Sequence, residues 1–131
     1  MKQTGNKGQA LVEFGLVVVM LVLLLAGTVD FGWMFGGIHT LNNAVREGAR
    51  VASITIDTPA GTRLAKVTTR VTEIAASFCG APTVGVTAAT TASGEPIVTV
   101  TATCPVTFPI NGKVVNLTSS SSFRDETKAG S

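Results

Sequence analysis

The sequence predicts an α+β protein in which a long N-terminal transmembrane helix continues into a small exported domain. That domain is expected to hold a second helix and an antiparallel sheet of three to four strands. Three observations lead to this fold class. A long apolar run lies near the start of the chain, apolar residues then recur every three or four positions, and beyond residue 83 they recur every second position.

Composition favours a membrane segment and gives no sign of catalysis. Apolar residues make up 45% of the 131 residues and charged residues only 14%, with a mean hydropathy of +0.42. The net charge of +2 and the absence of tyrosine give no basic, aromatic surface, so no nucleic-acid partner is expected. No catalytic residue, metal site or cofactor is expected either, because acids are not clustered and His39 is the one histidine.

The predicted transmembrane helix covers residues 9–38. Its apolar run, 10–29, is interrupted only by Glu13, and a bilayer is crossed by about 20 such residues. Trp33 stands where an interfacial aromatic side chain is expected. Lys2 and Lys7 precede the run, so the N-terminus should be cytoplasmic and residues 39–131 exported.

The helix is expected to continue to about residue 54, because no proline occurs before Pro59. A second helix is predicted over 62–78, with Thr62 as its N-cap. Its apolar face is expected to consist of Leu64, Val67, Val71, Ile74 and Phe78.

Strands are predicted between residues 83 and 124. Alternation with period two on both sides of 93–95 indicates a hairpin with one buried face, and Asn111-Gly112 indicates a second turn. Residues 125–131 are expected to form a frayed tail.

The two cysteines, Cys79 and Cys104, do not have the spacing of a redox pair or a zinc site. Export would place them in an oxidising compartment, and the first hairpin would bring them together, which favours a disulfide. The alternative is two small buried thiols.

The junction from Gly8 to Phe14 is the most informative stretch of the sequence. A polar, basic segment ends in Gly8, and the apolar helix then contains Glu13 followed directly by Phe14. An ordinary signal peptide has its cleavage site after the apolar core, where none is clear in this chain. A carboxylate inside a bilayer costs about 2.5–3.5 kcal/mol on insertion scales, so Glu13 requires an explanation.

These residues resemble the TadE-like family of tight-adherence (Tad) pilus systems. The resemblance covers residues 8–53, through GQALVEFGL, then VDFG, then NNAVREGARVAS. Trp33 stands where the family usually has a basic residue after DFG.

The resemblance implies that residues 1–8 are a leader removed by prepilin peptidase between Gly8 and Gln9. Glu13, which Phe14 directly follows, would then pair with the new amine of Gln9, either in its own chain or in a neighbouring subunit. The implied product is a structural subunit of a pilus or secretion system, in the bacterial inner membrane or an extracellular filament. Its implied partners are other pilin-like subunits, the inner-membrane assembly platform and membrane lipid.

Alternatives remain open at three points. Glu13 could be a helix-start acid at the headgroup level. Asp30 could be a wetted interfacial acid or a buried acid paired with a partner helix. The whole chain could be a membrane-anchored binding module that does not polymerise.

Overall fold

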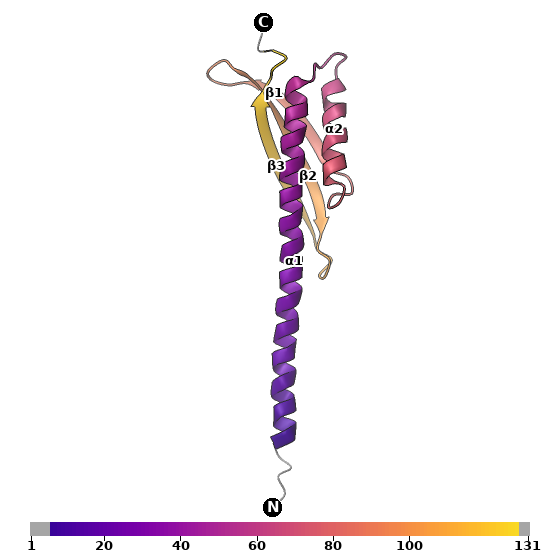
Figure 1. Cartoon of the computed structure of the whole chain (residues 1–131), viewed down its shortest axis with the longest axis vertical. Helices are drawn as coiled ribbons and strands as arrows, with labels where there is room; N and C mark the ends of the chain where they lie inside the picture. Colours follow the sequence, from indigo (N-terminus) through magenta and orange to yellow (C-terminus); the bar gives the residue numbers. More distant parts are fainter. Residues whose placement is uncertain (1–5, 129–131) are drawn as a thin grey trace, which may run out of the picture.

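The computed structural model describes residues 6–128 of the chain (Figure 1). Most of the predicted leader, residues 1–8, therefore lies outside the described residues, as do residues 129–131. The elements are, in order, α1 (Asn6–Ile54), α2 (Thr62–Ala75), β1 (Thr83–Thr90), β2 (Pro96–Thr107) and β3 (Val114–Arg124). The predicted α+β fold class is confirmed, with three strands.

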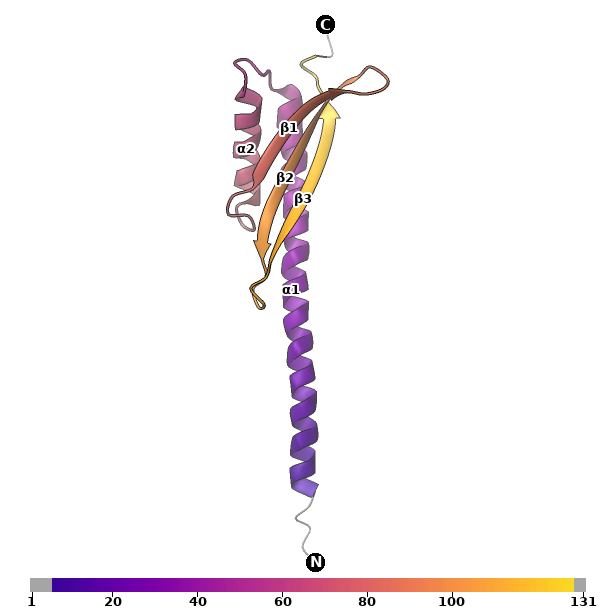
Figure 2. The same ribbon diagram turned by 180° about the vertical axis from the view of Figure 1, so that it is seen from behind.

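Helix α1 is a single rod of 49 residues, about 73 Å long at the usual rise per residue. Its first half stands clear of the domain, while its second half packs against the sheet and α2 (Figures 1 and 2). Glycines let the domain approach α1 closely near the middle of the rod. A Cβ atom at Gly36 would lie 3.0 Å from Cζ of Phe78, so a larger residue there would require the ring to move.

The sheet has the order β1-β2-β3, with both pairs antiparallel (Figure 2). Both predicted turns are present, and each contains a glycine in the left-handed region, Gly94 (φ 85°) and Gly112 (φ 67°). Alternate residues of the central strand β2 are buried against the helices, which confirms the single buried face. These residues are Val98, Val100, Ala102, Cys104 and Val106.

The core lies between the sheet and the upper half of α1, with α2 at its side. Small residues on α1, including Ala44, Ala49 and Ala52, are fully buried there. Gly48 is the tightest point, because a Cβ atom at this position would lie 2.7 Å from Cγ2 of Val71. The upper half of α1 therefore packs closely through small residues.

Helix α2 is shorter than predicted, and its predicted apolar face is confirmed at Val67 and Val71, with Ile74 packed against the core, but not at Leu64. It ends at Ala75 rather than at 78, and the glycine Gly61 (φ 93°) precedes its first residue, Thr62, at the N-cap position. Leu64 is 44% exposed, although the predicted apolar face contained it. Because residues four apart form one stripe on a helix, the buried set is Arg63, Val67, Val71 and Ala75.

The prediction of a frayed tail from residue 125 is wrong for the part that the structure describes. Asp125 is 1% exposed, and its backbone N–H donates to the carbonyl of Pro96 at 2.9 Å. Glu126 N–H donates to the carbonyl of Ser53 at 3.0 Å. The segment after β3 is thus fastened to the end of α1.

Candidate functional site

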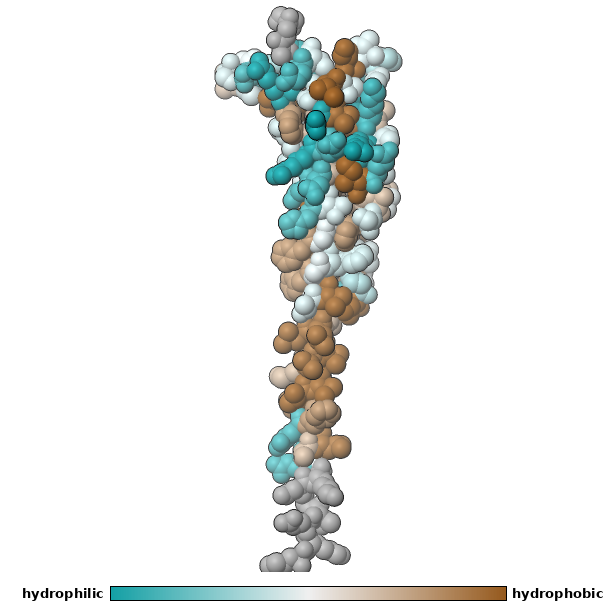
Figure 3. Space-filling view, in the orientation of Figure 1, coloured by the Kyte–Doolittle hydropathy of each residue, from teal (hydrophilic) through white to brown (hydrophobic). Residues whose placement is uncertain are grey.

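The lower half of α1 exposes an unusually apolar surface. The most apolar 18-residue window of this helix has a mean hydropathy of 2.7 and none of it is buried. On the face seen in Figure 3, brown, apolar side chains cover most of this part of the rod. By length and composition, this one N-terminal helix could span a membrane.

Glu13 is the one charged residue between Gly8 and Val29. Its carboxylate accepts a hydrogen bond from the side-chain amide of Gln9, with Nε2 and Oε1 3.3 Å apart. Phe14, next to it, is 69% exposed. Positions 9 and 13 therefore lie one above the other on the helix, within hydrogen-bonding reach.

Gly8 is helical, and nothing in the fold requires glycine there. A Cβ atom at this position would meet no atom within 4 Å. Glycine weakens a helix by about 1 kcal/mol relative to alanine. The packing of the described residues does not explain why this residue is glycine.

Asp30 lies where the domain first meets α1. Its side chain accepts a hydrogen bond from the backbone N–H of Ile110 at 3.0 Å, and the residue is 8% exposed. Ile110 belongs to the loop between β2 and β3. This arrangement differs from both alternatives considered above, because the partner of the carboxylate is the backbone of the chain's own domain.

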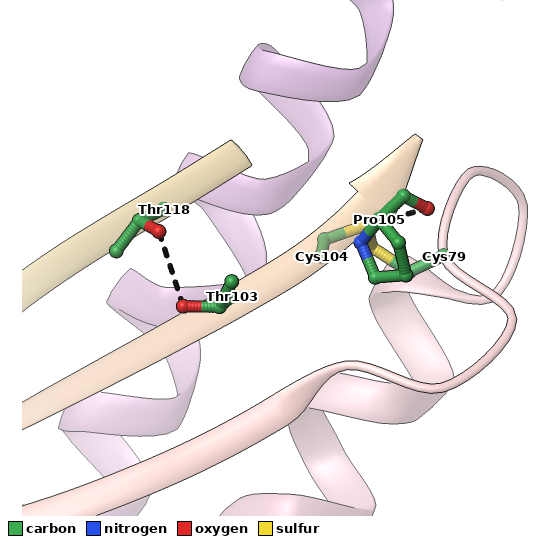
Figure 4. Close-up of a disulfide and its surroundings, with 5 residues drawn as sticks. All are labelled: Cys79, Thr103, Cys104, Pro105 and Thr118. Atoms are coloured by element: carbon green, nitrogen blue, oxygen red, sulfur yellow. Dashed lines mark hydrogen bonds between the residues drawn. A yellow bond between two sulfur atoms is a disulfide. The ribbon is translucent and has the colours of Figure 1, made fainter. Parts of the chain in front are cut away.

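Cys79 and Cys104 form a disulfide, with their Cα atoms 5.6 Å apart. Figure 4 shows the bond between the segment after α2 and strand β2, beside Pro105. On the same strand, Thr103 shares a hydrogen bond of 3.1 Å with Thr118 of β3. The disulfide thus joins the segment after α2 to the central strand of the sheet, and the alternative of two free thiols does not apply.

A buried ion pair, which the sequence reasoning missed, closes the upper end of the domain. Arg63 donates from Nη1 to Oδ2 of Asp125 at 3.0 Å and from Nε to the carbonyl of Thr55 at 2.9 Å. Burial by itself raises the pKa of the Asp125 carboxyl. Hydrogen bonds from Thr127 and Arg63, together with the charge of Arg63, outweigh burial and hold this pKa below its usual value of 3.8.

A second ion pair between the helices lies near the surface. Glu47 of α1 lies 3.5 Å from Arg70 of α2, and both side chains are partly accessible to solvent. Among the described residues, no group of three or more His, Cys, Asp or Glu side chains could hold a metal ion.

The comparison with protein families gives one match, over residues 8–50, and its description is TadE-like protein. This N-terminal segment is TadE-like. The predicted resemblance is confirmed over these residues, which are about a third of the chain. The TadE-like segment contains Gly8, Glu13 and Asp30 and ends at Arg50, within α1.

The TadE-like match associates the chain with Tad pilus systems. Neither curated proteins nor solved structures gave a match. Residues 51–131, which include α2 and the whole sheet, lie beyond the TadE-like segment.

Proposed function

We propose that this chain is a pilin-like structural subunit of a Tad-type pilus or secretion system, processed by prepilin peptidase. The lower half of α1 spans the bacterial inner membrane, with residues 1–8 cytoplasmic and the α+β domain on the outer side. The observation that carries the proposal is Glu13, a lone carboxylate on the apolar half of α1 and one helical turn from Gln9.

Cleavage between Gly8 and Gln9 would turn the backbone nitrogen of Gln9 into a free amine. The contact between the Gln9 amide and Glu13 supports this role, because it places a carboxylate oxygen within reach of position 9. An ammonium group and a carboxylate that pair offset much of each other's desolvation cost. In a filament, the same carboxylate pairs with the amine of a neighbouring copy and fixes the axial register between subunits.

Gly8 supports the processing step in a separate way. The fold has no packing reason for glycine at this position. A peptidase that binds an extended backbone gains from a residue without a side chain, since the backbone can then approach the active site closely.

The free surface of α1 supports assembly with other helices. Leu23, Leu24, Phe31 and Phe35 line a shallow groove on the helix, and small residues at its floor admit a close neighbour. The floor is formed by Gly27, Thr28 and Gly32. A Cβ atom at Gly27 or Gly32 would meet nothing within 4 Å in the chain itself, so these glycines are free to approach another subunit.

The deciding experiment combines intact mass with filament yield. The chain is expressed with and without its prepilin peptidase, and the membrane-extracted protein is weighed by mass spectrometry. We expect loss of residues 1–8 only when the peptidase is present. Retention of the leader would favour the alternative of an anchored binding module that does not polymerise.

Variants of Glu13 separate processing from assembly. We expect Glu13→Ala and Glu13→Gln to be cleaved normally but to yield no sheared filaments, whereas Glu13→Asp retains part of the yield. Thr69→Val is the control, because the Thr69 hydroxyl of α2 donates to the Ala65 carbonyl of its own helix, at 3.0 Å, and lies outside the groove on α1. Normal filaments from Glu13→Ala would show that the carboxylate has no role in assembly.

A further inference from the structure

We propose that the loop between β2 and β3, residues 108–113, is a second membrane contact that inserts into the outer interface of the bilayer. The inference rests on the proposed insertion of α1. It adds a partner for the exported domain itself, namely the lipid surface from which that domain emerges.

The loop lies at the level where the membrane should end. Ile110 is fixed to Asp30 by a hydrogen bond of 3.0 Å between its N–H and Oδ1. The stretch from Leu11 to Asp30 is about 28 Å long at the helical rise, close to the roughly 30 Å of a hydrocarbon core. Figures 1 and 2 show this hairpin as the part of the domain that reaches furthest toward the N-terminal half of α1.

The loop exposes two large apolar side chains beside the polar residues Asn111 and Lys113. Ile110 is 53% exposed and Val114, the first residue of β3, is 56% exposed. Exposed aromatic side chains continue this apolar surface on α1, where Phe31 is 61% and Phe35 is 56% exposed. Figure 3 shows that the brown, apolar surface of the bare helix reaches up to the lower edge of the domain.

Most backbone N–H groups of the loop have a hydrogen-bond acceptor within the chain. An N–H group without a partner costs free energy in a region poor in water, so inserted loops must satisfy their own donors. Proline has no N–H at position 109, and Ile110 donates to Asp30. Phe108 and Gly112 donate to carbonyls within the loop, at 2.9 and 3.0 Å, and Lys113 donates to Oδ1 of Asn111 at 2.7 Å. Among the described residues, the N–H of Asn111 at the turn has no such partner.

This arrangement also accounts for the buried carboxylate of Asp30. An acid at the edge of the span is costly, but here it accepts the N–H of Ile110, which has no acceptor within the hairpin. Lys113 is exposed next to Val114 and can extend its ammonium group to lipid phosphates. The turn at the other end of the sheet, residues 91–95, consists of small and polar residues and contains no large apolar side chain.

The test measures the depth of single tryptophan reporters in the full-length chain, reconstituted in phosphatidylcholine vesicles. Trp33→Phe removes the native tryptophan and keeps an aromatic ring against Phe78. On that background, Ile110→Trp reports on the loop, Leu21→Trp on the span, and Ser93→Trp on the opposite turn. Lipids brominated near the headgroup or deep in the acyl chain quench nearby tryptophan emission.

We expect the reporter at position 110 to lose emission with headgroup-proximal bromine, the reporter at position 21 with deep bromine, and the reporter at position 93 with neither. If position 21 is quenched and position 110 is not, the loop does not touch the bilayer, while the membrane insertion of α1 stands. If position 21 is not quenched, the membrane insertion and this inference fail together. Formation of the disulfide between Cys79 and Cys104 checks that each variant folds. If Ile110→Trp fails this check, Val114→Trp, at the first residue of β3, replaces it as the reporter.

Discussion

Arg63 and Asp125 are 62 positions apart in the chain and form an ion pair with side chains 8% and 1% exposed. Arg63 also donates to the hydroxyl of Thr127 at 3.0 Å, so α2, the end of β3 and the following segment meet at one guanidinium group. Replacing one member leaves the other charge buried without its counterion, which is costly. The pair therefore closes the end of the domain furthest from the proposed membrane.

The first prediction concerns the stability of this pair. We expect Asp125→Ala to lower the free energy of unfolding by about 3–5 kcal/mol, measured by denaturant unfolding in detergent micelles. Arg124→Ala is the control, because its ion pair with Glu95 spans 3.6 Å between exposed side chains. Such a surface pair is worth at most about 1 kcal/mol. Equal effects of the two variants would contradict the assignment.

The second prediction follows from the lowered pKa of Asp125. Between that lowered pKa and the usual 3.8, the unfolded chain binds more protons than the folded chain. Stability from this group is therefore complete above about pH 5 and is lost as the pH falls through the folded pKa. The difference in unfolding free energy between the wild type and Asp125→Asn should shrink as the pH is lowered from about 5 to about 3. A difference that stays constant over this range would rule out the proposed coupling.

The third prediction concerns the disulfide. Cys79 and Cys104 are separated by 25 positions, and closing such a loop stabilises a fold by about 3–4 kcal/mol in the chain-entropy account. We expect the double substitution Cys79→Ser and Cys104→Ser to lower the unfolding free energy by about that amount. Reductant should lower the midpoint of the wild type toward that of the variant and leave the variant unchanged. A wild type insensitive to reductant would refute this prediction.

The fourth prediction concerns the close approach of α1 and α2 at Gly48. We expect Gly48→Ala to destabilise the domain by about 1–2 kcal/mol, because its methyl group would collide with the buried side chain of Val71. Gly80→Ala is the comparison, since a Cβ atom there would meet nothing within 4 Å. Thermal unfolding followed by circular dichroism distinguishes the two variants, and a Gly48→Ala midpoint at or above that of the wild type would contradict the close packing.

Local patterns were sufficient for much of the fold. The period-two alternation on both sides of Gly94 predicted the first hairpin, and the structure pairs Thr83 with Thr103 in it. That register also brought the two cysteines together.

Contacts distant in sequence could not be predicted in the same way. Asp125 belongs to a polar C-terminal stretch that has the composition of a tail, and its burial depends on an arginine on another element. The predicted face of α2 began with Leu64 because leucine is apolar, whereas the structure buries the neighbouring Arg63 together with Val67 and Val71. For Asp30, its partner is a backbone N–H of a distant loop, which leaves no trace in side-chain patterns.

Helix α1 is continuous from the bare apolar half into the domain. Because its 49 residues form an unbroken rod, the chain has no hinge between the bare apolar half and the domain. Any tilt or rotation imposed on the lower end must turn the upper end through the same angle. Axial tension would likewise reach the domain along the helix rather than through a flexible tether.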